Sequence, residues 1–206
     1  FEAGTRAGEA GLGPGTAHWL GTDALGRDIF SRVIFGARIS LGVAGAAVGL
    51  GGVAGMVIGL VSGVRGGRVD LLLQRAVDLV LAFPPLVLLI VAARLAGPSQ
   101  AHVALVIAVV VAPGVARVVR GAVLVEREQP YIEASRALGA GDARIVWHHL
   151  LPNIGPLVLA VTTTLLASAM LAEASLSFLG LGVPPPNPSW GADVAASRAA
   201  FPVNVG

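Results

Sequence analysis

Long runs of apolar residues, rather than an alternation of apolar and polar positions, dominate this chain. No charged residue occurs between Arg38 and Arg65, and a helix over the 26 residues between them would be about 39 Å long. Leu150 to Ala172 is a second uncharged run of similar length. A helix needs roughly 20 mostly apolar residues to cross a bilayer. The pattern therefore predicts membrane-spanning helices.

Two further segments are apolar but shorter. Leu79 to Ala93 reaches span length only with the amphipathic stretch that begins at Leu71. The run from Ala101 to Ala116 tolerates His102 at its start. We therefore predict an all-α polytopic membrane protein whose first residues form a flexible extracytoplasmic segment. The predicted elements are a leader over 1–18, an amphipathic helix over 27–38, and spans over 39–64, 71–93, 98–116 and 150–172.

The composition agrees with a membrane protein and excludes several kinds of site. Of the 206 residues, 55% are hydrophobic and 13% are charged, whereas soluble domains have about 25% charged residues. All 14 lysine-plus-arginine residues are arginine, so the lysine of a Walker A phosphate loop is missing. Without cysteine there is no disulfide or thiolate metal site. Any ATP hydrolysis must therefore come from another chain. A net charge of +2 without clustered cations argues against nucleic acid as a binding partner.

Arginine counts give an orientation. The loops on one side of the predicted spans contain eight arginines and the other side six. Because cytoplasmic loops are enriched in basic residues, we predict that the first side is cytoplasmic. Its arginines are Arg65, Arg68, Arg75, Arg117, Arg120, Arg127, Arg136 and Arg144.

Four glycines, Gly51, Gly55, Gly59 and Gly63, recur at every fourth position of the first predicted span. On a helix they form a ridge without side chains, which predicts close packing against another helix. The stretch 49–54 also matches a dinucleotide-binding fingerprint, but that motif needs a preceding strand. We favour the packing interpretation.

Residues 19–41 predict a polar turn followed by the amphipathic helix. Thr22 or Asp23 can cap the helix, and Asp28 precedes Arg32 by one turn, which suits an ion pair. These acids and the nearby histidine would be available for hydrolysis, but no nucleophile is placed beside them. We therefore interpret the segment as structural, lying along the bilayer interface.

The polar segment over 126–153 predicts a helix, a glycine elbow and a second helix. Pro130 suits a first helical turn, and Gly139 ends that helix. Asp142 can cap the next helix, which Pro152 is expected to end. A short helix of this kind can dock in a groove of another protein. The residues along its exposed side would be Tyr131, Ala134 and Leu138.

Three blocks of sequence carry a family resemblance. They are Glu133-Ala134-Ser135 with Gly139 and Leu150–Asn153, the segment Leu20–Leu41, and Glu173–Gly182 followed by the proline-rich stretch to Gly191. The first resembles the EAA loop of permease subunits of binding-protein-dependent ABC importers. The second is similar to the marker of the peptide and nickel branch, second-subunit type, and the third to the last-loop signature. The blocks occur in family order, although Ser135 and Leu150 replace the usual alanine and isoleucine.

The resemblance implies the helical bundle of a type I ABC importer transmembrane domain, with four of the usual six spans and the first and last expected to be missing. It implies a multi-pass subunit of a bacterial-type cytoplasmic membrane that is not an enzyme and holds no cofactor. The implied partners are a second homologous permease, an extracytoplasmic solute-binding protein, membrane lipid and two ATPase subunits, which would bind ATP and Mg and receive the EAA loop in a cleft.

The resemblance also assigns candidate site residues. Those of the ATPase-coupling loop are Tyr131, Glu133, Ala134, Ser135, Leu138, Gly139, Asp142, Leu151 and Pro152. Those of the extracytoplasmic motif are Gly21, Thr22, Asp23, Gly26, Arg27 and Asp28, and the outer loop is expected over 180–206. The implied solute is a di- or oligopeptide, with nickel or a metal chelate as the alternative.

Glu173 ends an uncharged run, where an acid is costly unless it faces water or a partner. We expect a role in the solute pathway or gate, with an interhelical hydrogen bond as the alternative. A secondary transporter would need paired charges in mid-span, and an intramembrane protease would need a base near the serines at 168–177, which the sequence lacks. His148 and His149 point about 100° apart on a helix and do not suit one metal ion.

Overall fold

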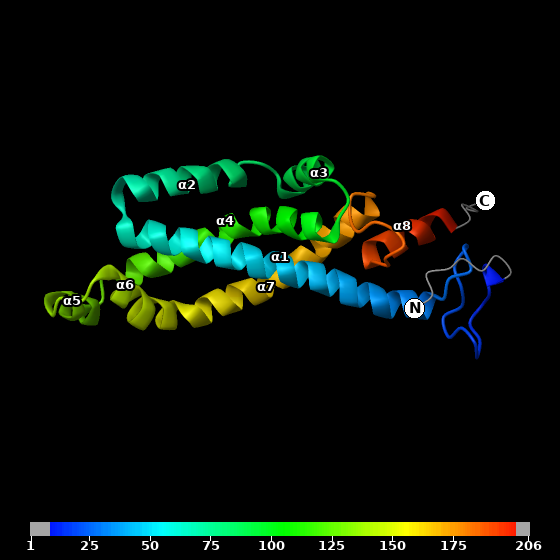
Figure 1. The fold of residues 1–206 in the computed structure, drawn as a ribbon, viewed down its shortest axis with the longest axis horizontal. Helices are drawn as coiled ribbons and strands as arrows, with labels where there is room; N and C mark the ends of the chain where they lie inside the picture. The colour runs from blue at the N-terminus through cyan, green and yellow to red at the C-terminus, as the bar shows by residue number, and fades with distance from the viewer. Residues whose placement is uncertain (1–8, 201–206) are drawn as a thin grey trace, which may run out of the picture.

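The computed structural model describes residues 9–200 and is built from helices (Figure 1). Within this range β-type pairing is limited to an isolated antiparallel bridge between Thr22 and Asp28. The predicted all-α class is therefore confirmed. The elements are α1 (Ile29–Arg65), α2 (Gly67–Leu81), α3 (Pro85–Ala96), α4 (Gln100–Glu126), α5 (Pro130–Ala137), α6 (Asp142–Ile145), the π-helical turn η2 (Val146–Leu150), α7 (Leu151–Phe178) and α8 (Trp190–Ala200).

In the described part of the chain, three helices are long and apolar enough to cross a membrane. They are Ile29–Arg65, Gln100–Glu126 and Asp142–Phe178, the last of which joins α6, η2 and α7. The pair α2 and α3 would form a fourth span, bent by 91°. The chain is thus polytopic, as predicted.

The first helix is longer than predicted. The sequence predicts an amphipathic helix over 27–38 and a span over 39–64, but α1 is continuous from its N-cap, Asp28, to Gly66, which ends it with a φ of +62°. Glycines inside a helix weaken it without breaking it. The polar outer segment and the first span therefore share one axis.

The second predicted span, over 71–93, is broken. Pro84 has no amide hydrogen to continue α2, and Pro85 occupies the first turn of α3, where proline is favoured. The other two predicted spans both continue beyond their expected ends, to Glu126 and Phe178.

The predicted glycine ridge is the contact surface between α1 and α4. A Cβ atom added at Gly51, Gly55 or Gly59 would lie 2.7, 2.5 or 2.7 Å from a carbonyl oxygen of α4. The three carbonyl groups are also four residues apart: Ala108, Ala112 and Ala116. The two helices therefore run parallel with their backbones in contact, and the dinucleotide interpretation of the ridge is wrong.

The parallel pair determines the path of the rest of the chain. Because α1 and α4 point the same way, α2 and α3 must carry the chain back between them, and α7 then returns beside both helices (Figure 1). The turn between α1 and α2 lies at the same end of the bundle as α5 and α6, and the opposite end holds residues 9–28 and α8. We refer to these as the elbow end and the rim end.

Helix α2 turns its polar side inward. Arg120 of α4 donates two hydrogen bonds of 2.6 Å to the carboxylate of Asp70. Ser62 of α1 also donates to Asp70 and accepts a 2.9 Å hydrogen bond from Gln74. Arg68, Arg75 and Asp78 of α2 stay exposed, and so do several large apolar side chains, which suit an apolar surrounding. The apolar ones include Leu71, Leu72 and Leu79.

Helix α8 is fastened across the rim end. Arg32 Nε of α1 donates a 2.7 Å hydrogen bond to Asp193, and Trp190 Nε1 donates to the Val33 carbonyl at 3.0 Å. The expected pairing of Arg32 with Asp28 is therefore wrong, because the buried guanidinium turns toward α8. The predicted outer loop over 180–206 contains this helix, and its residues 201–206 lie outside the described range.

The described part of the predicted flexible leader is bonded to the rim. Thr22 N donates to the Leu12 carbonyl at 3.0 Å, and Leu12 N donates to Thr22 Oγ1 at 2.9 Å. Gly11 N donates to the Asp23 carbonyl at 3.0 Å. The segment over residues 9–18 is thus hydrogen-bonded to Thr22 and Asp23 at the rim end, and residues 1–8 lie outside the described range.

The ridge gives a test of the packing between α1 and α4. Gly55→Ala should lower the free energy of unfolding by about 1–3 kcal/mol, because the added methyl overpacks the contact with Ala112. Gly45→Ala is the matched control, since a Cβ there meets nothing within 4 Å. Thermal unfolding of the two variants in detergent micelles checks this, and equal unfolding midpoints would contradict the described helix contact.

Candidate functional site

The elbow predicted over 126–153 is present, and its local geometry follows from its glycines. Helix α5 begins with Pro130 and ends at Leu138, after which Gly139 adopts a φ of +86°. This left-handed conformation favours glycine, because a Cβ would be strained there. Helix α6 then starts at Asp142, whose carboxylate lies 3.7 Å from Arg136 of α5. The chain therefore reverses within a few residues.

The second arm of the elbow does not end where the sequence predicts. Pro152 is expected to terminate it, yet Pro152 lies in the first turn of α7, and the helix continues from Asp142 to Phe178. The π-helical turn η2 inserts there, and proline is tolerated at the start of the following α-helix. The arm and the span thus form one continuous rod, and His148 and His149 lie in η2 rather than in a loop.

The outer surface of the elbow is apolar at two points. Leu138 is 90% exposed at the end of α5, and Trp147 is 70% exposed on η2. Glu133, Ala134 and Gly139 are exposed beside Leu138. Sequence reasoning missed Trp147, although a tryptophan in a polar loop is itself a signal of a contact surface. Two large exposed apolar groups on the elbow are what a docking surface needs.

The inner surface of the elbow is anchored in the bundle. Ile132 of α5 and Ile145 of α6 are buried, as are Leu150 and Ile154 below them. They belong to the same apolar core as the upper helices. The elbow is therefore a folded part of the bundle rather than a free loop.

Polar side chains also join the elbow to the spans. The Tyr131 hydroxyl donates to Glu126, the last residue of α4, and Asn153 of α7 donates to Glu126 Oε1 at 2.8 Å and to the Tyr131 oxygen at 2.7 Å. Ser135 Oγ lies 3.2 Å from His149 Nε2, and the His149 ring is 5.5 Å from the Tyr131 ring. Sequence reasoning places Tyr131 and Ser135 in the coupling loop but not these contacts.

Glu173 lies on α7, toward the rim end, and is fully buried. Ser177 Oγ donates a 2.7 Å hydrogen bond to Glu173 Oε1, within the same helix, while Oε2 has no hydrogen-bond partner in the described range. Ser177 Oγ also accepts a 3.4 Å hydrogen bond from the Val183 amide. The carboxylate is thus linked to the turn after α7, and the expected interhelical bond is replaced by one within α7.

The outer motif is a compact rim turn. Asp23 Oδ1 accepts 2.9 Å hydrogen bonds from the Leu25 and Arg27 amides, and Arg27 Nε donates to Asp23 Oδ2 at 2.7 Å. Gly21 and Gly26 have φ values of +76° and +73°, which permit the tight turns. Burial works to raise the pKa of Asp23, but the hydrogen bonds and charge of Arg27, with the Leu25 amide, lower it below its usual value.

Asp28, rather than the predicted Thr22 or Asp23, caps the first helix. Its carboxylate accepts a 2.8 Å hydrogen bond from the Ser31 amide and lies 3.1 Å from His18. The Ser31 hydroxyl and amide, opposed in part by burial and helped by His18, hold the pKa of Asp28 below its usual value. Thr22 pairs with Leu12 instead, so it is a turn residue.

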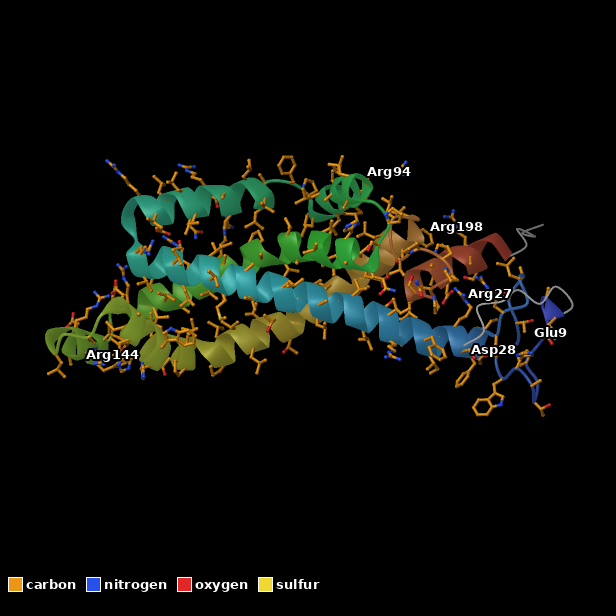
Figure 2. All side chains as sticks on the ribbon, in the orientation of Figure 1. Glu9, Arg27, Asp28, Arg94, Arg144 and Arg198 are labelled. Atoms are coloured by element: carbon orange, nitrogen blue, oxygen red, sulfur yellow. The ribbon has the colours of Figure 1, made fainter. Side chains whose placement is uncertain are left out.

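The two ends of the bundle carry different sets of candidate residues. Arg144 lies at the elbow end, whereas Arg27, Arg94 and Arg198 lie at the rim end (Figure 2). This separation agrees with the predicted sidedness of the arginines. Among residues 9–200, no group of three or more His, Asp or Glu side chains is placed to hold a metal ion.

Comparisons with known proteins identify relatives over most of the chain. Residues 55–203 match the family described as binding-protein-dependent transport system inner membrane component. A glutathione transport system permease protein, GsiD, of Pectobacterium atrosepticum is 40% identical over 187 residues, which are 91% of this chain and 62% of that protein. A dipeptide transport system permease protein, DppC, of Alkalihalophilus pseudofirmus is 41% identical over 90% of this chain and 61% of that protein. The chain thus spans about 62% of the length of GsiD and 61% of the length of DppC.

A solved structure has the same fold. The MetNI methionine ABC transporter in an inward-facing conformation matches with a TM-score of 0.66 and 26% identity, over 75% of this chain and 77% of that chain. A second crystal form of MetNI matches with the same TM-score over 84% of this chain and 88% of that chain, at 23% identity. The predicted fold of a type I ABC importer transmembrane domain is confirmed.

The cap at Asp28 gives a pH-dependent test. Asp28→Ala should lower the free energy of unfolding by about 1 kcal/mol at neutral pH. Because the pKa of folded Asp28 lies below its ordinary 3.8, this stabilisation is complete above pH 3.8 and is lost as the pH falls through the folded-state pKa. Unfolding in micelles, followed by tryptophan fluorescence across this range, should show the gap between wild type and variant closing in acid.

Asp28→Asn is the control, since the amide oxygen can still cap the helix but carries no charge. Its stability relative to Asp28→Ala should not change with pH. A gap between wild type and Asp28→Ala that is equally large in strong acid would contradict the capping role of the carboxylate.

Proposed function

Because the chain belongs to the family of binding-protein-dependent transport system inner membrane components, we propose that it is a permease subunit of an ATP-driven importer that carries peptides across the cytoplasmic membrane by alternating access. The observation that carries the proposal is the elbow, which presents exposed Leu138 and Trp147 at one end of the bundle. The chain has no lysine for a phosphate loop. ATP would therefore be hydrolysed in a partner subunit, and the resulting motion would be transmitted to this chain through the elbow.

The elbow would dock in a cleft of a cytoplasmic ATPase subunit. Glu133 lies in the first turn of α5, where a carboxylate suits the positive end of the helix, and Leu138 ends the helix with its side chain free. Asp142 begins the second arm beyond Gly139. ATP and Mg would bind in two such partner subunits, and their closure would move the elbow.

The moving elbow would rock the spans between inward-open and outward-open states. Helices α6, η2 and α7 form one continuous rod from Asp142 to Phe178, which supports such a lever. A second homologous permease would complete the pathway, and a solute-binding protein would deliver solute at the rim end. Peptide as the solute is supported by the names of two relatives, a glutathione transport system permease protein and a dipeptide transport system permease protein.

Glu173 would act at the outer gate without touching solute. Its carboxylate is buried and linked through Ser177 to the Val183 amide, at the start of the proline-rich turn. The position of that turn therefore depends on the carboxylate. A plain structural hydrogen bond would stabilise the same turn but would not respond to the transport cycle.

Substitutions in the elbow test the coupling role. Gly139→Pro should lower ATP-dependent uptake at least about tenfold, because proline requires a φ near −65° and Gly139 has +86°. Glu133→Arg should do the same by placing a cation at the positive end of α5. Uptake of radiolabelled peptide by proteoliposomes that contain the whole complex measures this effect.

Gly141→Pro is the matched control for Gly139→Pro, since Gly141 already has a φ of −75°. It should keep uptake within about twofold of wild type. Normal uptake by the Gly139→Pro and Glu133→Arg complexes would reject the coupling role of the elbow.

Glu173→Gln separates the two interpretations of the buried acid. Glutamine keeps a carbonyl acceptor for Ser177 and removes the charge. If the acid acts at the gate, uptake should fall at least about fivefold while the thermal stability of the complex stays within about 1 kcal/mol of wild type. Unchanged uptake by Glu173→Gln would leave only the structural hydrogen bond.

A further inference from the structure

Three polar side chains form a closed ring of hydrogen bonds at the base of the elbow. The Tyr131 hydroxyl donates to Glu126, and Asn153 donates to Glu126 Oε1 at 2.8 Å and to the Tyr131 oxygen at 2.7 Å. We call Glu126, Tyr131 and Asn153 the base triad. Glu126 ends α4, Tyr131 belongs to the first turn of α5, and Asn153 belongs to the first turn of α7. The triad thus joins three helices at one point.

A second contact holds the other side of α5. The His149 ring of η2 lies 5.5 Å from the Tyr131 ring, and His149 Nε2 lies 3.2 Å from Ser135 Oγ. Ser135 is one helical turn beyond Tyr131. Helix α5 is therefore held along its length against η2 and, at its start, against α4 and α7.

The apolar anchor alone would not fix the orientation of α5. Ile132 is the single fully buried side chain of this eight-residue helix. One buried side chain can serve as a pivot, because apolar contacts have little directional preference. Hydrogen bonds are directional, so the base triad supplies the orientation that Ile132 does not.

We propose that Glu126, Tyr131 and Asn153 are positioning residues that make α5 move as one body with α4 and α7. The inference rests on the proposed function and deepens it. Docking depends on the exposed end of α5 at Leu138, whereas Tyr131 of the base triad lies in the first turn of that helix. Loss of the triad lets a docked α5 tilt about Ile132 without moving the spans. The triad therefore sets how much solute is carried for each ATP hydrolysed, and not how tightly the ATPase binds.

The test uses the complete complex with its ATPase subunits. The double variant Tyr131→Phe/Asn153→Ala removes the triad but keeps the ring that contacts His149. Three quantities are measured: binding of the ATPase subunits, ATP hydrolysis, and peptide uptake in proteoliposomes. Binding should stay within about twofold of wild type, while uptake per ATP hydrolysed falls about fivefold to tenfold, as expected for the loss of two or three hydrogen bonds.

Conservative variants separate positioning from folding. Glu126→Gln keeps the Oε1 acceptor and should retain the wild-type ratio of uptake to hydrolysis, whereas Glu126→Ala should lower it. Glu128→Gln is the matched control, since Glu128 is exposed two residues further on. An unchanged ratio in the double variant, or an equal loss in Glu126→Gln and Glu126→Ala, overturns the proposal.

A distance measurement tests the geometry independently of transport. The chain has no cysteine, so Val125→Cys on α4 and Ala137→Cys on α5 give two unique spin-label positions, both exposed. In the complete complex, the distance distribution between them should broaden when Tyr131→Phe/Asn153→Ala is added. An unchanged distribution overturns the positioning role.

Failure of the proposed function would give a different result. If the Leu138→Asp complex binds its ATPase subunits as tightly as the wild-type complex does, the elbow is not the docking surface. A double variant that loses ATPase binding as strongly as Leu138→Asp would show that the triad is part of that surface, and would overturn its assignment as a positioning element.

Discussion

The direct contact of two backbones determines this architecture. At Gly51, Gly55 and Gly59 of α1, even a methyl group would come within 2.7 Å of a carbonyl oxygen of α4. In a membrane, where apolar side chains gain little by leaving lipid, such close van der Waals contact is a main source of helix association. Because the contact repeats every four residues on both helices, it also sets their register. The pair is parallel, so the connection between them must cross the length of the bundle, and α2 and α3 exist to make that crossing.

Polar contacts between side chains hold the other helices, α2, α5 and α8, against the rest of the bundle. A helix that returns through an apolar surrounding is favoured when its polar groups are paired. In α2, Asp70 pairs with Arg120, and Gln74 donates a hydrogen bond to Ser62 of α1. At the rim end, Arg32 and Asp193 fasten α8 to α1. At the elbow end, Ile132 and the base triad fasten α5 to α4 and α7. Each end is therefore closed by polar contacts between helices, and the α1–α4 contact along the glycine ridge is one of close packing.

Much of the fold could be predicted from the sequence, because the sequence patterns that specify it are local or periodic. The uncharged runs, the glycine ridge and the reversal at Gly139 each depend on neighbouring residues. The prediction was wrong where a partner far along the chain decides the outcome. Arg32 has an acid one turn away, at Asp28, yet it pairs with Asp193, because α8 folds over it and Asp28 is already occupied by Ser31 and His18. In the candidate site, the tip at Leu138 follows from the motif, whereas the base triad depends on contacts between Glu126 and Asn153, 27 residues apart.

The difference between the two ends bears on how a bundle of this kind can move as proposed. Helix α1 and α4 cannot slide past each other without driving carbonyl oxygens into glycine backbones, so they can only move together. Helix α7 packs against both but leaves most of its apolar surface uncovered, and it has no glycine ridge of comparable closeness. A force applied at the elbow enters α7 directly, through the unbroken run from Asp142, and reaches the α1–α4 pair through Glu126. Relative motion is therefore easiest between α7 and the pair, and a change in the angle of α7 would carry Glu173 and the turn after it at the far end.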